Sequence, residues 1–238
     1  MKNLYKLLLL IFFCSTCLGE KSLTINERQL FDFIDDVALS YTVSRLPGGY
    51  KKMWKKNPGE LKIFLDGNWN GNAAFIFKKA AQDIGYLADL NVSVVHEAKD
   101  CNLHVGMGFD SIKDVYKDFK KGYNPSLWEY DAAIKLDLKT LHISKCLGFI
   151  SERHINNNAL LEYFSYRILI VSLGFTGLSN TYDGSIFCSP FLSCKPPSNL
   201  DRLCIKLMYS DNIKPKMKIT DIKKVVRHFE LLDLVNDL

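Results

Sequence analysis

The chain has 238 residues, of which 47% are hydrophobic and 24% are charged, a balance that is typical of a folded globular protein and excludes a disordered one. Its formal net charge is +5, but the lysines are dispersed along the sequence. The densest basic group lies around Tyr50 and Trp54 in residues 48–60. Basic residues interleaved with aromatic ones can bind nucleic acid or an anionic membrane surface, but we interpret this group as a solvated loop with one buried tryptophan. The composition therefore indicates no nucleic-acid partner.

The N-terminus has the pattern of a secretory signal peptide, because two lysines precede a short apolar run at residues 7–13 and small residues follow it. The run is too short to span a bilayer, which takes about 20 residues. We expect cleavage after Gly19, so that residues 1–19 are the signal peptide and residues 20–238 are one exported domain, periplasmic or secreted. An uncleaved anchor and a lipoprotein acylated on Cys17 are the alternatives. No later segment is apolar enough to be a transmembrane helix, and export also argues against nucleic acid.

In the oxidising compartment that export implies, we expect the five cysteines of the mature chain to form two disulfides and to leave one free thiol. These cysteines are Cys101, Cys146, Cys188, Cys194 and Cys204. A local disulfide between Cys188 and Cys194 and a disulfide across strands between Cys101 and Cys146 are the candidate pairings, although five cysteines allow many others. Structural zinc is disfavoured, because no two of these cysteines have C-x-x-C spacing.

The first 150 residues combine helical and strand patterns. A capping box at Thr24 predicts a first helix, and Asn72 is expected to cap a second one. The second helix is predicted to bury one face, formed by Phe75, Ile76, Ala80, Ile84 and Leu87. Strand patterns occur at residues 61–65, 92–95, 102–109, 132–138 and 141–144.

The rest of the chain is mostly helical. A helix over about 159–173 is apolar almost all round, which predicts that it is buried in the middle of the fold, and Gly174 suits its end. Another helix is expected from Ser198 or Asn199, and Thr220 is expected to cap the last. This order predicts an α+β fold: a mixed β-sheet with a buried central helix and a helical C-terminal part.

The central helix ends where a zinc helix of the H-E-x-x-H type would end, but it lacks the ligands. When Leu173-Gly174 is aligned with the end of that motif, Arg167 and Val171 occupy the two histidine positions, Ile168 that of the glutamate, and Gly177 that of a third histidine. None of these side chains can bind zinc or act as its base. We therefore predict no metal, no cofactor and no catalytic residue on this helix.

A second metal candidate is "HEAKD", from His96 to Asp100. Aspartate can bind zinc, but the stretch follows one predicted strand directly and leads into the next. We interpret it as a polar connection. The sequence contains no nucleophile elbow and no phosphate-binding loop, and nothing in it nominates a catalytic triad.

Several segments together resemble a bacterial family of exported proteins of unknown function, whose fold is similar to that of the zincin metalloproteases. They are "FDFIDDVAL", "KKMWKKNPGELKIFLDG", "SLGFTGLSNTYDGSIF" (172–187) and "SNLDRLCIKLMYSDNIKPKM" (198–217). The resemblance implies a degenerate zincin-like fold and export, and it supplies no activity.

The favoured function is therefore a non-catalytic exported domain that binds a protein, a peptide or an envelope component. The candidate binding rim is the loop 175–187, with Tyr182, Asp183 and Ser185 exposed, because loops on a rigid scaffold commonly carry binding. The alternatives are an exported hydrolase with relocated catalytic residues, including a metalloenzyme that uses His96, and a lipid-anchored envelope interaction protein.

Overall fold

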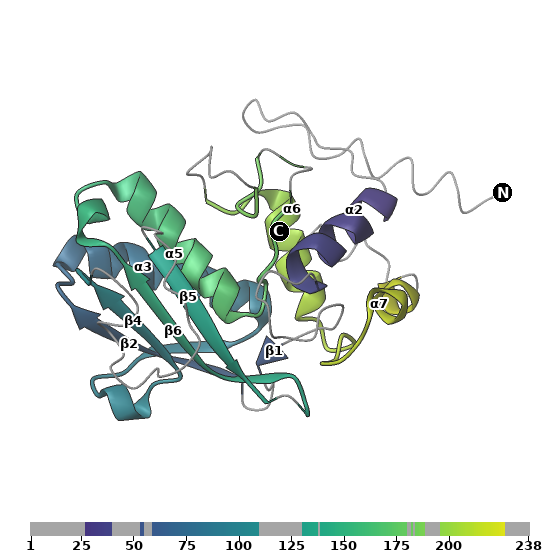
Figure 1. Cartoon of the computed structure of the whole chain (residues 1–238), viewed down its shortest axis with the longest axis horizontal. Helices are drawn as coiled ribbons and strands as arrows, with labels where there is room; N and C mark the ends of the chain where they lie inside the picture. The colour runs from purple at the N-terminus through teal and green to yellow at the C-terminus, as the bar shows by residue number, and fades with distance from the viewer. Residues whose placement is uncertain are drawn as a thin grey trace.

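The strands form one mostly parallel sheet in the computed structural model (Figure 1). Among the described residues the sheet has six strands: five follow the order β1-β6-β4-β2-β3, and the sixth, β5, also pairs with β6. Only the β5–β6 pairing is antiparallel, so the predicted mixed sheet is confirmed. The strands are β1 (Met53–Trp54), β2 (Glu60–Gly67), β3 (Asn91–Val94), β4 (Leu103–Met107), β5 (Tyr130–Leu136) and β6 (His142–Ile150). The structure describes residues 27–39, 53–54, 59–109, 130–137, 139–179, 182, 184–188 and 196–226.

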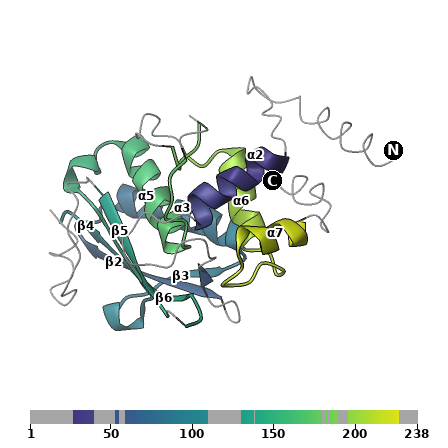
Figure 2. The same ribbon diagram turned by 45° about the vertical axis from the view of Figure 1, so that its right-hand side comes forward.

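Helices α3 and α5 lie against one face of this sheet, and α2, α6 and α7 gather beside it (Figures 1 and 2). The helices are α2 (Glu27–Ile34, followed by the π-helical turn Asp35–Leu39), α3 (Gly71–Ala88), α5 (Asn158–Ser172), α6 (Asn199–Met208) and α7 (Ile219–Val226). None of the described helices is long and apolar enough to cross a membrane. The predicted α+β class is confirmed at this level.

Helix α5 forms the centre of the core, as its apolar sequence predicts. Ile168 is fully buried and packs against Gly148 of β6. The polar side chains of Ser165 and Ser172 are also fully buried, and each donates a 2.6 Å hydrogen bond to a carbonyl of the preceding turn. Two apolar residues that the prediction placed on this helix, Leu160 and Val171, are only half-buried.

Gly148 allows α5 to lie close to the sheet. A Cβ atom on this residue would meet the Cγ2 atom of Ile168 at 2.6 Å. Gly148→Ala should therefore lower the free energy of unfolding by about 1–3 kcal/mol, because the packed core cannot absorb an extra methyl group. Urea unfolding would measure this loss. In the background of Ile168→Ala, which removes the clashing atom, the same glycine substitution should cost much less; an equal cost in both backgrounds would contradict the prediction.

Three local expectations are corrected by the structure. Asn70, and not Asn72, caps α3, because its Oδ1 accepts a 2.8 Å hydrogen bond from the amide of Ala73. Phe75 does not belong to the buried face of that helix, since 66% of it is exposed. Helix α7 begins at Ile219, so Thr220 lies within it instead of capping it.

No disulfide joins the cysteines of the described part of the chain to one another. Cys101 is half-buried, and Cys146, Cys188 and Cys204 are buried. The proposed disulfide between Cys101 and Cys146 is thus not formed: Cys146 lies opposite Leu103 in the sheet, and its sulfur is fully buried, whereas the thiol of Cys101 bonds to a carbonyl of its own turn. The other proposed pairing involves Cys194, which lies outside the described residues.

Candidate functional site

The C-terminal half of α5 is the candidate site that the sequence singled out. Arg167, at the first ligand position, is 5% exposed, and its Nη1 donates a 3.1 Å hydrogen bond to the carbonyl of Ile186. Its guanidinium carbon lies 5.9 Å from the centre of the Phe187 ring. Gly174 ends this part of the chain with φ 92, a conformation that favours glycine. Arg167, which takes the place of a metal-binding histidine, therefore anchors α5 to the loop 184–188.

That loop is also fixed from α6 by Asp201, which is fully buried. One carboxylate oxygen accepts a hydrogen bond from the hydroxyl of Ser185 at 2.5 Å. The other accepts from the amide of Ile186 at 3.0 Å and from both the amide and the hydroxyl of Ser198 at 2.7 Å. The same carboxylate completes the capping box of α6. Sequence reasoning missed this contact, although the Ser-x-x-Asp spacing predicts the cap.

The candidate binding rim is less exposed than the sequence suggested. Ser185 is only 3% exposed, so the expectation of an exposed Ser185 is wrong: its hydroxyl donates to Asp201 and accepts from the amide of Phe187. Tyr182 is half-buried, with its ring 5.4 Å from that of Phe33 in an edge-on arrangement. Its buried hydroxyl has no hydrogen-bond partner among the described residues, and burial raises its pKa. Asp183 lies outside the described residues.

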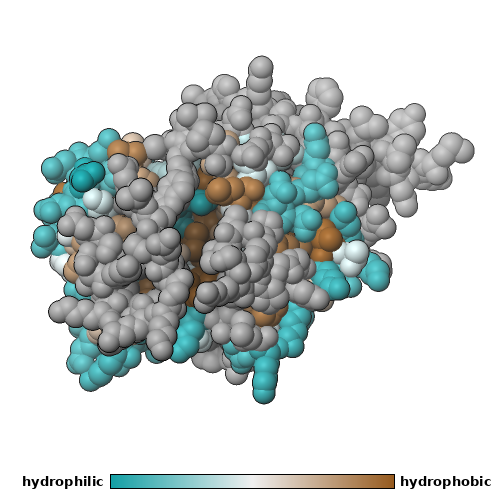
Figure 3. Space-filling model, in the orientation of Figure 1, coloured by the Kyte–Doolittle hydropathy of each residue, from teal (hydrophilic) through white to brown (hydrophobic). Residues whose placement is uncertain are grey.

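The C-terminal end of α5 reaches the surface. Figure 3 shows apolar residues near the middle of the face seen in Figure 1, in the region where that view draws α5. Val171, Thr176 and Leu178 are half-buried, so this end of the helix and the segment after it reach the surface. Apolar side chains at a surface are suited to binding and carry no catalytic group.

A histidine–carboxylate contact exists elsewhere in the sheet. Nε2 of His104 on β4 lies 3.0 Å from Oδ2 of Asp66 on β2, and burial lowers the pKa of this histidine. His104 is next to Val105, which pairs with Gly148, and the latter faces α5. Because side chains alternate along a strand, His104 lies on the sheet face opposite α5. It therefore does not share a site with that helix.

The second metal candidate forms a connection. Residues 96–100 include a single 3-10 turn, Ala98–Asp100, between β3 and β4, with no longer helix to bring His96 and Asp100 together. Glu97 pairs with the exposed Lys99 at 2.6 Å. In the described part of the chain, no three His, Cys, Asp or Glu side chains gather as ligands for one metal ion.

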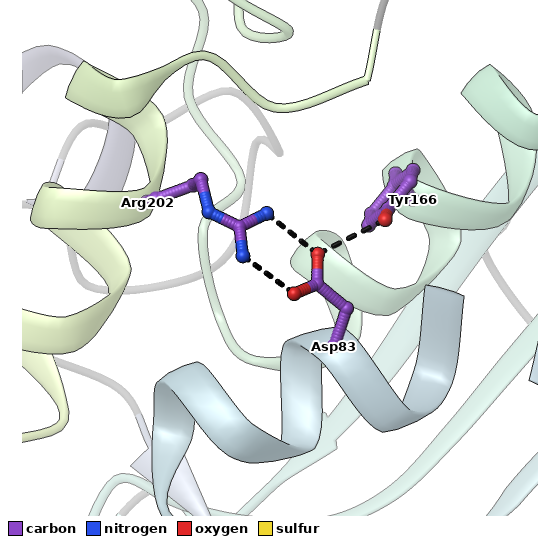
Figure 4. A network of polar contacts seen from close by, with 3 residues as sticks. All are labelled: Asp83, Tyr166 and Arg202. Atoms are coloured by element: carbon purple, nitrogen blue, oxygen red, sulfur yellow. Dashed lines mark hydrogen bonds and ion pairs between the residues drawn. The ribbon is translucent and has the colours of Figure 1, made fainter. Parts of the chain in front are cut away.

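A polar network joins three of the helices (Figure 4). Arg202 of α6 donates to both carboxylate oxygens of Asp83 on α3, at 2.7 and 2.6 Å. The hydroxyl of Tyr166 on α5 donates to the same carboxylate at 2.9 Å. Hydrogen bonding to Asp83 raises the pKa of Arg202, and burial raises that of Tyr166. All three groups point at one another, so the network fixes the three helices relative to one another.

The comparisons with known proteins place no further constraint on the site. No protein-family model and no curated protein matches this chain. Its class is that of α+β domains with a mostly parallel sheet and a buried central helix.

The contact between Arg167 and the loop 184–188 gives a testable expectation. Arg167→Met keeps the aliphatic stem but removes the hydrogen bond to Ile186, so we expect a loss of about 1–2 kcal/mol in the free energy of unfolding. The amides of the loop should exchange with solvent faster. The control is Arg153→Met, because Arg153 is exposed and should tolerate the same change within about 0.5 kcal/mol. Equal effects of both substitutions would show that Arg167 does not anchor the loop.

Proposed function

We propose that the chain is an exported, non-catalytic domain with a degenerate zincin-like fold, which binds a protein, a peptide or an envelope component. The observation that carries the proposal is that Arg167 holds the loop 184–188 to α5. Arg167 occupies the position of the first histidine in the H-E-x-x-H motif. It is buried, and it donates a hydrogen bond to the backbone carbonyl of Ile186 in the neighbouring loop. An arginine cannot lose its proton to bind a metal, and here it holds the loop instead.

Two further features support a binding role. Ile168, at the position of the catalytic base in the zinc motif, packs in the core against Gly148. The half-buried Val171 and Leu178 give the end of α5 and the segment after it an apolar surface on a rigid support, which suits recognition. The zincin-like part of the proposal is supported by the helix that packs on the sheet and ends at Gly174.

A photo-crosslinking amino acid at Gly184 tests the proposed rim, and one at Gly71 provides the matched control. A Cβ atom added at either position meets no atom of the described residues within 4 Å. Both variants are produced in cells that export the chain. We expect a discrete crosslinked product from position 184 and none from position 71. No product at 184, or the same products from both positions, would contradict a binding site at this loop.

Metal analysis separates the proposal from the alternative of a metalloenzyme that uses His96. The exported chain is purified without a metal-binding tag, and its zinc, iron and manganese contents are measured. Substoichiometric metal together with a specific crosslink at position 184 supports the non-catalytic function. Stoichiometric metal that is lost on His96→Ala would instead establish a metal site in the connection between β3 and β4, and it would overturn the proposal.

A further inference from the structure

The outward face of α3 has two large aromatic side chains in solvent. Phe75 is 66% exposed and Tyr86 is 72% exposed, the highest values among the large hydrophobic residues that the structure describes. They are eleven residues apart, which is about three helical turns, so they lie on one face of α3 about 16 Å from each other. These two side chains do not contribute to the hydrophobic core, since a different face of the helix packs there. That face consists of Ala73, Phe77, Ala80, Ala81, Ile84, Leu87 and Ala88.

The space between the two aromatic side chains is positively charged. Lys78, Lys79 and Gln82 are exposed between them. The nearby carboxylate of Asp83 is turned to the side of the helix, where Arg202 and Tyr166 bind it (Figure 4). The outward stripe from Phe75 to Tyr86 therefore presents two lysines between two aromatic rings and no unpaired acid.

We infer that this stripe docks on the surface of an anionic lipid membrane. Aromatic rings favour the interface between water and hydrocarbon, and lysines extend their ammonium groups toward the lipid phosphates. Charge complementarity selects the membrane over a second copy of the chain. An antiparallel pairing of two α3 helices would set the lysines at the centre of one stripe against those of the other. The inference is independent of the proposed function, because it uses neither α5 nor the loop beside it.

Binding of the full chain to lipid vesicles tests the inference. The probes are vesicles of phosphatidylglycerol mixed with phosphatidylethanolamine, and vesicles of phosphatidylcholine alone. We expect wild-type protein to bind the anionic vesicles in preference to the zwitterionic ones, and added salt to weaken this binding. Lys78→Gln with Lys79→Gln should weaken it about thirty-fold, at about five-fold for each lysine near the surface. Phe75→Ser with Tyr86→Ser should weaken it by about ten-fold or more.

Lys214→Gln with Lys216→Gln is the matched control, because these two lysines are exposed outside α3. All variants have the same N-terminus, so a difference between them reports on α3 and not on residues before it. Circular dichroism and thermal unfolding verify that each variant is folded. Equal binding by the α3 lysine variant and the control would overturn the inference, as would equal binding to both kinds of vesicle. A dimer that the aromatic variant dissociates would also overturn it, by showing that a second copy covers the stripe.

Discussion

Asp201→Ala is expected to cause the largest loss of stability, about 3–5 kcal/mol in the free energy of unfolding. The carboxylate accepts four hydrogen bonds, and the substitution would leave the buried amide of Ile186 and the amide of Ser198 without an acceptor. Each orphaned buried donor costs about 1–3 kcal/mol. The capping box of α6 would be lost at the same time, for about 1 kcal/mol. Urea unfolding with linear extrapolation would measure the loss.

Asp201→Asn is the matched control, because asparagine keeps the shape and one acceptor oxygen. That oxygen can receive the donors of Ile186 and Ser198, while the hydroxyl of Ser185 can rotate to accept from the new amide. We therefore expect a smaller loss, about 1–2 kcal/mol. An alanine variant as stable as the asparagine variant would mean that the carboxylate does not hold the loop to α6.

The pH dependence of stability gives a second readout at the same residue. Burial raises the pKa of Asp201 above its ordinary value of 3.8, against the opposing effect of its hydrogen bonds. The folded protein then holds this proton more tightly than the unfolded chain does. Its contribution to stability is complete below pH 3.8 and is lost as the pH rises through the raised pKa. Asp201→Asn should remove this component, so the stability difference between wild type and variant should shrink as the pH rises.

Structural elements that a strong local sequence pattern specifies could be predicted from the sequence. The helix α5 is apolar almost all round, and this property predicts its burial in the centre of the fold. The cap at Ser198 follows from the spacing to Asp201. The assignment of Phe75 to the buried face failed for a physical reason. The prediction places Phe75 in the core because it is large and apolar, but it lies on the side of α3 opposite the buried Ile84.

Contacts between segments far apart in the chain could not be read from local patterns. Arg167 was recognised as unable to bind metal, but its partner Ile186 is nineteen residues away and contributes a backbone carbonyl, which has no sequence signature. Ser185 was expected to be exposed because serine in a loop usually is, and the carboxylate that buries it comes from another helix. Such contacts depend on how the elements pack and appear only in three dimensions.

Asp83→Ala is expected to cost about 2–4 kcal/mol in the free energy of unfolding. The side chains of Asp83 and Arg202 are only 21% and 25% exposed, so water cannot fully replace their two hydrogen bonds. The substitution also deprives the hydroxyl of Tyr166, a buried residue, of its carboxylate partner. Because the three groups belong to α3, α6 and α5, their separation should loosen the contacts among all three helices (Figure 4). Urea unfolding again gives the magnitude.

A double-mutant cycle distinguishes this network from three independent contacts. Tyr166→Phe removes one hydrogen bond and leaves the ion pair, so it should cost only about 1 kcal/mol. Arg202→Met alone leaves a half-buried carboxylate that has lost its cation, and it should cost nearly as much as Asp83→Ala. When Asp83→Ala and Arg202→Met are combined, the total should fall well below the sum of the single losses, because each single substitution already breaks the same bidentate pair. Strict additivity would mean that Asp83 and Arg202 stabilise the helices separately, and the network would then have no role in joining α3 to α6.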